Sequence, residues 1–190
     1  MPSLLLHICC AHCGAYSIEH WRNQGYSVTA FWYNPNIHPY LEHQQRLGAV
    51  EMLANASGTA LIRHDSYDIV EFFRAVVGHE GDRCRHCFRL RLSLTASVAR
   101  DRCFDAFSTT ILISPYQKHE LARQTGEATA ADYGVTFLYA DLRKRFSDSR
   151  RITKPMGLYR QQYCGCLFSE VERYRGLGQS TSGGAQVTVE

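Results

Sequence analysis

Eight cysteines stand out in this sequence of 190 residues, and seven of them fall in three short motifs. The first motif is CCAHC at residues 9–13, the second is CRHC at residues 84–87, and the third is YCGC at residues 163–166. Thiolates are ligands for soft metal ions and nucleophiles in disulfide exchange. The pattern therefore predicts metal binding, thiol redox chemistry or both.

The first two motifs together supply the ligands for one metal centre. Cys84 and Cys87 are three residues apart, so on a helix both side chains lie on one face. Cys9 and Cys10 are adjacent, and on a strand their side chains would point to opposite faces. We therefore expect the chain to leave its strand before Cys9, where the free N–H groups of a following helix stabilise thiolates. These four thiols suit structural zinc or an iron–sulfur cluster. Structural zinc sites are common, which slightly favours zinc. A position at the end of a strand is where functional sites usually lie, which argues against a purely structural ion.

The remaining cysteines leave alternatives open. Cys13 either packs inside the following helix or binds an additional metal. Cys164 and Cys166 are two residues apart with Gly165 between them, which permits a small, strained disulfide that exchanges readily. The same pair would equally serve as metal ligands or as buried thiols. Cys103 has no partner nearby in the sequence, and we expect a small buried hydrophobic residue at that position.

These motifs lie on a chain that alternates between strand-like and helix-like segments. Runs of apolar, β-branched and aromatic residues predict strands, and helical spacing with caps or closing glycines predicts the helices. This alternation predicts an α/β fold with a parallel sheet and helices on both faces, whose ligands bind at the carboxyl ends of the strands. The predicted strands are residues 3–8, 26–33, 59–64, 104–112 and 135–140, and the predicted helices are residues 14–24, 40–56, 66–77, 84–101, 114–125 and 157–175.

The composition indicates one globular domain. The chain is 45% hydrophobic and 21% charged, which excludes a disordered protein. No apolar run approaches the ~20 residues of a membrane helix, and the first residues lack the features of a signal peptide. We therefore expect a cytoplasmic protein with no membrane partner, in which structural disulfides are rare. Residues 1–175 are predicted to form a single α/β domain, and the Gly/Ser-rich residues 176–190 a disordered tail.

The net charge of +3 is small, but basic residues gather near the cysteine motifs. Residues 142–160 contain seven Lys or Arg and one acidic residue, and residues 83–91 contain four arginines and no acidic residue. A basic run is often only a solvated surface. It also binds phosphate backbones, so RNA is a candidate partner.

Five stretches of the sequence resemble one known family, the cobalamin-independent epoxyqueuosine reductases called QueH. They are LHICCAHC, YNPNIHP followed by EHQQR, RCRHCFRLRL, FSTTILISPYQKHE and YRQQYCGCLFS, in the family's order across residues 6–169. The joint occurrence of the vicinal cysteines, the C-x-x-C motif and Y-C-G-C makes the resemblance specific. One departure is His12, at a position where an amide side chain or proline is often found.

The resemblance implies a fold, a reaction and cofactors. The fold is Rossmann-like, of the HUP type, and the reaction removes the epoxide oxygen from epoxyqueuosine at the tRNA wobble position to give queuosine. The family is described as using a [4Fe–4S] cluster with a neighbouring iron. An external donor of unknown identity would supply the electrons. By position, Cys9, Cys10, Cys84 and Cys87 match the cluster-binding cysteines, while Cys164 and Cys166 match a pair proposed as redox-active. Cys13 is at a variable position and is a candidate catalytic residue at the second iron.

Recognition of a wobble base implies further contacts. Bases of RNA loops are read unstacked, against aromatic and hydrogen-bonding side chains. Tyr33, Asn34 and Asn36, in the loop after the second strand, are the expected base contacts, although Asn36 serves a turn equally well. The expected phosphate contacts are Arg143, Lys144 and Arg145.

Two rival interpretations follow from the same residues. A zinc-stabilised RNA- or nucleotide-binding module would explain the first two cysteine motifs and the basic runs, but it gives YCGC no role. A thiol–disulfide exchanger would explain YCGC, but it leaves the vicinal cysteines without a role.

Overall fold

A computed structural model describes residues 1–64 and 66–178 of the chain. Its core is a five-stranded, all-parallel sheet with the strand order β3-β2-β1-β4-β5, which confirms the predicted α/β fold. Each strand lies inside its predicted range, although the last is much shorter than expected. The strands are β1 (Ser3–His7), β2 (Ser27–Trp32), β3 (Ala60–Arg63), β4 (Ala106–Thr109) and β5 (Thr136–Phe137).

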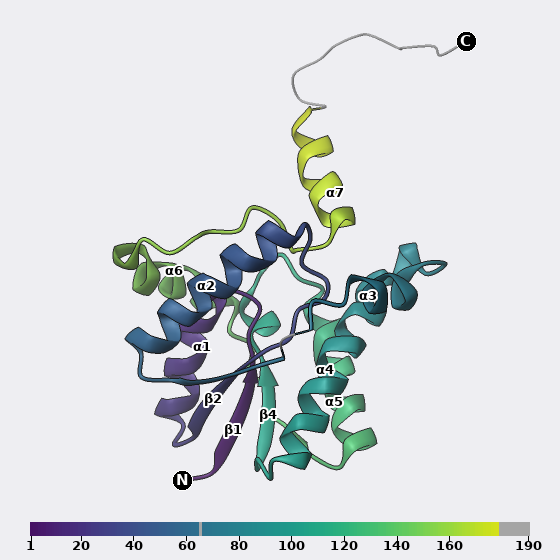
Figure 1. Ribbon diagram of the computed structural model, residues 1–190. Helices are drawn as coiled ribbons and strands as arrows, with labels where there is room; N and C mark the ends of the chain where they lie inside the picture. The colour runs from purple at the N-terminus through teal and green to yellow at the C-terminus, as the bar shows by residue number, and fades with distance from the viewer. Residues whose placement is uncertain (65, 179–190) are drawn as a thin grey trace, which may run out of the picture.

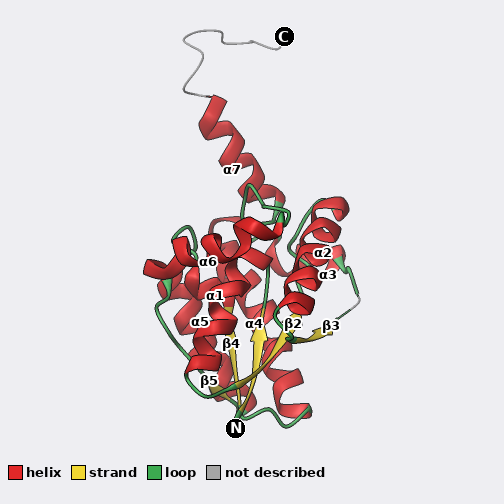
Figure 2. Ribbon diagram, turned by 90° about the vertical axis from the view of Figure 1, so that its left-hand side faces the viewer, coloured by secondary structure: helices red, strands yellow, loops and turns green. Residues whose placement is uncertain are grey.

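Helices cover both faces of the sheet, as Figures 1 and 2 show. On one face α1 packs against α2 and β2, and α6 packs against α1; on the other face α4 packs against α5, β1 and β4. The helices are α1 (Ala11–Asn23), α2 (Tyr40–Ala56), α3 (Ile69–Val76), α4 (Arg83–Asp101), α5 (His119–Tyr133), α6 (Phe146–Thr153) and α7 (Leu167–Gly178). Short 3₁₀ helices are η1 (Glu80–Asp82), η2 (Thr110–Ile113), η3 (Arg143–Arg145) and η4 (Lys154–Met156).

The central strand β1 has an apolar sequence because both of its faces are covered. Leu4, Leu5 and Leu6 are all fully buried, with Leu4 and Leu6 in the core under α1 and Leu5 in the core under α4. A strand buried on both faces needs a continuous apolar run instead of alternation. The triple leucine therefore fixes β1 at the centre of the sheet.

The first cysteine motif lies where the strand order reverses. From β1 the chain builds β2 and β3 on one side of the sheet, and then crosses to place β4 and β5 on the other side. The carboxyl end of β1 is consequently a topological switch point, where ligands bind in open parallel sheets. Residues 9–13 follow directly from this end.

The fifth helix differs from its predicted range. Ser114 was expected to be its N-cap and Gly126 to follow its end, but α5 begins at His119 and continues through Gly126 to Tyr133. Gly126 is in the helix because of a close tertiary contact: a Cβ there would lie 2.3 Å from the ring of Phe137. The helix ends instead at Gly134, in the left-handed conformation with φ of 67°.

The last part of the chain also differs from prediction. The expected helix over residues 157–175 begins only at Leu167, so the YCGC motif lies in an irregular segment that precedes α7. Helix α6 was not predicted. Cys103 is exposed, with a positive φ of 56°, so its predicted burial is wrong.

Two further expectations concern the ends and the surface of the chain. Among the described residues, no helix has the length and apolar character needed to cross a membrane. Most of the predicted tail lies outside the described residues, and α7 continues to Gly178, three residues beyond the expected domain boundary. Helix α7 projects from the body on the side where the strands end (Figure 1).

Candidate functional site

Cys9, Cys10 and Cys13 form a compact group of thiols at the start of α1. Cys10 is the N-cap, and its sulfur accepts a hydrogen bond from the N–H of Cys13 at 3.3 Å. The three sulfur atoms lie within 4.8 Å of one another. The chain leaves the strand before Cys9, as the vicinal cysteines predicted, and the group meets the geometry of a metal site.

The three thiols share their protons unequally. Hydrogen bonds from the Cys10 and Cys13 thiols hold the pKa of Cys9 well below its usual value, against the effect of burial. Burial raises the pKa of Cys10 to about 12, and the neighbouring thiols Cys10 and Cys9, with burial, raise that of Cys13. Of the three thiols, Cys9 is therefore the one whose negative charge its neighbours stabilise.

Close packing holds the backbone of this cysteine loop. The side-chain amide of Asn34 donates a hydrogen bond to the carbonyl of Ile8 at 2.9 Å. Gly14, one turn into the helix, allows Ile8 to approach, because a Cβ at Gly14 would lie 2.2 Å from Ile8 Cδ1. The N–H of Cys9 donates to the Thr110 hydroxyl at 3.3 Å.

His7 joins three strand ends directly beneath the thiols. Its Nε2 donates to the carbonyl of Tyr33 at 3.2 Å, and its Nδ1 lies 2.9 Å from the Thr109 hydroxyl, which donates to it in the neutral tautomer. Burial, with a smaller effect from Arg91, lowers the pKa of His7 to about 4. His7 is therefore a neutral structural group that ties β1, β2 and β4 together.

Helix α6 is fixed to the cysteine loop through His12. The ring Nδ1 of His12 lies 2.5 Å from the Thr153 hydroxyl, and its backbone carbonyl accepts a hydrogen bond from Ser149. Ser149 in turn accepts from the N–H of Tyr16 at 3.0 Å. These contacts give His12 a role at its unusual position and bring the basic segment against α1.

The second motif lies at the start of α4, as expected, with both thiols on that helix. Cys87 is buried in an apolar cluster with Phe72, Val76 and Cys166. Cys84 is half-buried and packs against the cluster that contains Phe88. Neither thiol belongs to the compact group at Cys9, so the four-thiolate site stays a prediction.

The third motif is clamped to α2 by a buried ion pair. Arg46 donates hydrogen bonds to the carbonyls of Cys164 at 2.8 Å and Tyr163 at 3.1 Å, and its guanidinium lies 2.7 Å from the Glu42 carboxylate. The Tyr159 hydroxyl donates to the other oxygen of Glu42. Sequence reasoning missed these roles, although both residues lie in the stretch EHQQR that carried part of the family resemblance.

Gly165 is required by the approach of the loop after β2. Its φ of +149° is a conformation that other residues rarely adopt, and a Cβ there would lie 3.0 Å from the side-chain nitrogen of Asn36. The N–H of His38 donates to the Gly165 carbonyl at 2.8 Å. The turn between Cys164 and Cys166 is thus fixed on both sides.

Two glutamines donate to sulfur atoms of the first and third motifs. The amide of Gln161 lies 2.8 Å from the sulfur of Cys10, and the amide of Gln117 lies 3.1 Å from the sulfur of Cys164. Sequence reasoning missed both residues. Their positions in YRQQYCGC and SPYQKHE, beside residues already singled out, were the available signal.

Arg91 connects the three motifs electrostatically. Its side chain is 2% exposed, and its Nε donates to the carbonyl of Cys87 at 3.3 Å. Burial opposes the charge, yet the thiols of Cys87, Cys164 and Cys9 raise the pKa of Arg91 above its usual value. The same guanidinium partly offsets the effect of burial on the pKa of Cys164. Cys87, whose carbonyl Arg91 binds, also packs in one cluster with Cys166, so the second and third motifs meet beside this buried positive charge.

Comparison with known proteins places this centre in a family. The profile of the family described as Epoxyqueuosine reductase QueH matches residues 4–172. A Dehalococcoides mccartyi protein named Epoxyqueuosine reductase QueH is 54% identical over 173 residues, which cover 91% of this chain and 95% of that protein. A Thermotoga maritima protein of the same name is 36% identical, with 91% and 93% covered. The chain belongs to the epoxyqueuosine reductase QueH family.

Membership confirms the resemblance and identifies the protein as an oxidoreductase of tRNA modification. A solved structure described as a predicted subunit of tRNA methyltransferase from Methanocaldococcus jannaschii is similar, with a TM-score of 0.52. It is 13% identical, and the match covers 83% of this chain and 89% of that one. That likeness shows the α/β fold alone.

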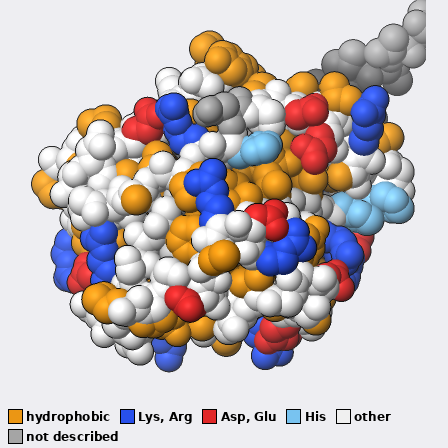
Figure 3. Space-filling model, turned by 60° about the horizontal axis from the view of Figure 1, so that its bottom comes forward, with side chains coloured by type: hydrophobic (Ala, Val, Ile, Leu, Met, Phe, Trp, Pro, Cys, Tyr) orange, Lys and Arg blue, Asp and Glu red, His pale blue; other side chains and the backbone are white. Residues whose placement is uncertain are grey.

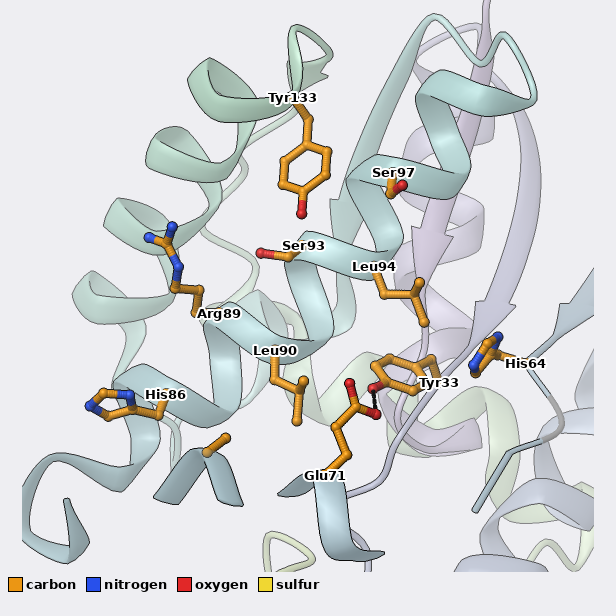
Figure 4. A pocket seen from close by; sticks show the side chains of 11 residues that line it. Tyr33, His64, Glu71, His86, Arg89, Leu90, Ser93, Leu94, Ser97 and Tyr133 are labelled. Atoms are coloured by element: carbon orange, nitrogen blue, oxygen red, sulfur yellow. Dashed lines mark hydrogen bonds between the residues drawn. The ribbon is translucent and has the colours of Figure 1, made fainter. Parts of the chain in front are cut away.

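The predicted base contacts of this QueH protein have different surroundings. Tyr33 points into a groove along α4, where its hydroxyl donates to Glu71 at 2.6 Å (Figure 4). Asn34 and Asn36 are buried beside the cysteine loop and the YCGC turn, and the side-chain oxygen of each has no hydrogen-bond partner in the structure. The structure therefore separates Tyr33 from the two asparagines.

The groove beside Tyr33 is distinct from the thiol centre of this QueH protein. It has a volume of about 490 Å³, and no cysteine lines it. Ala75 and Leu90 in its wall also pack against the cluster of Cys87 and Cys166, so these two side chains lie between the groove and the thiols. The groove is lined by Tyr33, His64, Glu71, Ala75, His86, Arg89, Leu90, Ser93, Leu94, Ser97 and Tyr133.

The three predicted phosphate contacts differ in whether a carboxylate forms an ion pair with them. Arg143 is paired with Asp141 at 2.5 Å, and Arg145 is paired with Asp148 at 2.9 Å. Lys144 is exposed, and no carboxylate within the described part of the chain pairs with it. On the opposite side of the molecule, near the amino ends of the strands, acidic and basic side chains are interspersed (Figure 3).

Proposed function

We propose that this QueH protein reduces the epoxide of epoxyqueuosine at the tRNA wobble position to give queuosine, using an iron–sulfur cluster held by its cysteines. The observation that carries the proposal is the compact group of Cys9, Cys10 and Cys13 at the carboxyl end of β1. Beside it, the second and third motifs meet where Cys87 packs against Cys166. Residues 1–175 act as one catalytic domain.

The residues present fit such a cofactor. In the proposed assignment Cys9, Cys10, Cys84 and Cys87 hold a [4Fe–4S] cluster, and Cys13 binds an additional iron. Support comes from the close approach of Cys9, Cys10 and Cys13, from a donor set made only of sulfur, and from a buried arginine nitrogen that lacks a partner. When bound, the irons supply a Lewis acid for the epoxide oxygen and a path for single electrons.

The thiols of Cys164 and Cys166 would supply the electrons and protons that the reaction consumes. Their oxidation to one disulfide releases two electrons and two protons. Removal of the epoxide oxygen consumes the same number: both carbon–oxygen bonds break, a carbon–carbon double bond forms, and the oxygen leaves as water. An external donor then reduces the disulfide. The Arg46 clamp and Gln117 hold this pair in place.

The tRNA is proposed to approach the carboxyl edge of the sheet with its wobble base unstacked. Asn34 and Asn36 are the proposed base contacts, because their free side-chain oxygens accept hydrogen bonds from a base or its substituent. Lys144, with Arg143 and Arg145, is proposed to bind phosphates. All eight cysteines are free thiols in the structure, which supports a cytoplasmic location.

The test is conversion of epoxyqueuosine in tRNA, followed by nucleoside mass spectrometry on protein purified without oxygen. We expect Cys164→Ser to lose turnover while keeping most of its iron, and Cys84→Ser to lose iron and turnover together. Cys103→Ser is the matched control, because Cys103 is exposed and outside the three motifs. Full turnover by Cys164→Ser would overturn the thiol-pair step, and a zinc-only wild type would favour the binding-module interpretation.

A further inference from the structure

Arg91 differs from the other arginines of its segment. Arg83 pairs with Glu172, Arg85 with Asp82 at 2.7 Å, and Arg89 with Asp132 at 3.2 Å. Arg91, which is 2% exposed, pairs with no carboxylate within residues 1–64 and 66–178.

The guanidinium of Arg91 is only partly hydrogen-bonded. Its Nε donates to the carbonyl of Cys87 at 3.3 Å, and one terminal nitrogen has no partner in the structure. Its Cζ lies 5.5 Å from the centre of the Phe88 ring. An arginine keeps its proton in proteins, so this position holds a permanent, partly unsatisfied positive charge.

A buried charge without a counter-charge is strongly unfavourable, so the site requires an anion. The groups beside Arg91 that can become anionic are cysteines: its Nε binds the carbonyl of Cys87, and Cys87 packs in one cluster with Cys166. Negative charge on Cys87, Cys164 or Cys9 would raise the pKa of Arg91. The anion that satisfies Arg91 is therefore the combined negative charge of thiolates and whatever they bind.

We propose that Arg91 is a positioning residue of the metal centre, which neutralises its thiolate ligands and raises the reduction potential of the cluster. This inference rests on the proposed function. Reduction adds negative charge to the centre, and a fixed positive charge in a low-dielectric interior stabilises the reduced form more than the oxidised form. Removal of the charge therefore makes the cluster harder to reduce.

The test compares four proteins purified without oxygen: wild type, Arg91→Met, Arg91→Lys and Arg89→Met. The last is the matched control, because Arg89 lies on the same helix but is exposed and paired with Asp132. For each we measure iron and acid-labile sulfide per chain, and the midpoint potential of the cluster by spectroscopic titration.

We expect Arg91→Met to shift the reduction equilibrium at least tenfold towards the oxidised form, or about 59 mV for one electron. Arg91→Lys keeps the charge and should recover most of this shift, while Arg89→Met should match wild type. If Arg91→Met takes up no iron, retention of the cluster by Arg91→Lys at the wild-type potential supports the inference.

Three results would overturn the proposal or its basis, and they are distinguishable. A wild-type protein without iron and sulfide contradicts the proposed function itself. A wild-type potential in Arg91→Met, with the cluster present, overturns the role of Arg91 and leaves the proposed function standing. Loss of the cluster in both Arg91→Met and Arg91→Lys shows that packing matters instead of charge, and it also overturns the inference.

Discussion

Replacement of Arg46 by methionine tests how the YCGC turn is held. The substitution removes one partner of a buried ion pair, since the side chains of Arg46 and Glu42 are 2% and 8% exposed. It also removes the donors to the carbonyls of Tyr163 and Cys164. Breaking a buried pair in this way costs about 3 to 5 kcal/mol of unfolding free energy, because the remaining charge stays buried without compensation. We expect a loss in this range.

The assay is urea unfolding under anaerobic conditions, at equal metal content, followed by the fluorescence of Trp21 and Trp32, which are both buried. Arg123→Met is the matched control, because Arg123 makes a solvent-exposed pair with Glu120 within one helix, and such a pair contributes little to stability.

A double variant, Glu42→Gln with Arg46→Met, separates charge from packing. It leaves neither charge buried, so we expect it to be more stable than Arg46→Met alone. We also expect Arg46→Met to speed alkylation of Cys164, because the backbone of that residue loses its anchor. The reasoning is refuted if Arg46→Met costs no more than Arg123→Met, or if the double variant is the least stable of all.

Three further predictions concern packing, pH and RNA. Gly14→Ala should destabilise the protein by about 1 to 3 kcal/mol in urea unfolding, since the added Cβ would lie 2.2 Å from an isoleucine side chain, whereas Gly48→Ala, with nothing within 4 Å, should be neutral or stabilising. Burial lowers the pKa of His43 to about 4, and its Nε2 accepts a hydrogen bond from Trp32. The folded state therefore binds fewer protons than the unfolded state, and His43 should contribute up to about 3 kcal/mol of stability that is lost as the pH falls from ~6.5 towards the folded pKa. His43→Gln should remove this contribution and leave that of His7, whose pKa is also lowered to about 4. An unchanged slope would exclude His43 as a source. Lys144→Gln should weaken tRNA binding and reduce the slope of log K against log salt by about 0.7 to 0.9; a wild-type slope would remove Lys144 from the interface.

The fold follows from local sequence where local signals agree with tertiary demands. The triple leucine of β1 and the apolar runs of β2 and β4 have no alternative to burial in a central sheet. Helix α2 has the predicted bounds, 40–56, because a proline before it and small residues at its end terminate it locally. Local sequence also predicts the helix that carries Cys84 and Cys87, because apolar residues recur along this segment at helical spacing without interruption.

The predicted helix bounds are wrong where contacts between distant parts of the chain override local preference. Residues 157–166 have helical composition, but Arg46, 117 and 118 residues away in the sequence, binds the carbonyls of Tyr163 and Cys164. The contacts hold these carbonyls towards α2, and Gly165, with a φ of +149°, breaks the helical backbone between the two cysteines. Gly126 shows the reverse case, in which a glycine that suggests a helix end is needed inside the helix for the ring of Phe137.

The site was only partly predictable for the same reason. Thiol types and spacing predicted a group that could hold a metal and the irregular backbone at Cys9, because these depend on the chain's own geometry. The glutamine donors to Cys10 and Cys164, and the single arginine among four that lacks a carboxylate partner in the described residues, depend on packing between elements.

The central claim is that the thiols of three motifs hold a redox cluster and not a structural ion. The most direct measurement is the content of iron, acid-labile sulfide and zinc in protein purified strictly without oxygen. The account predicts iron with matching sulfide and a visible absorption that dithionite bleaches. Zinc alone, with no sulfide even after reconstitution, would contradict it.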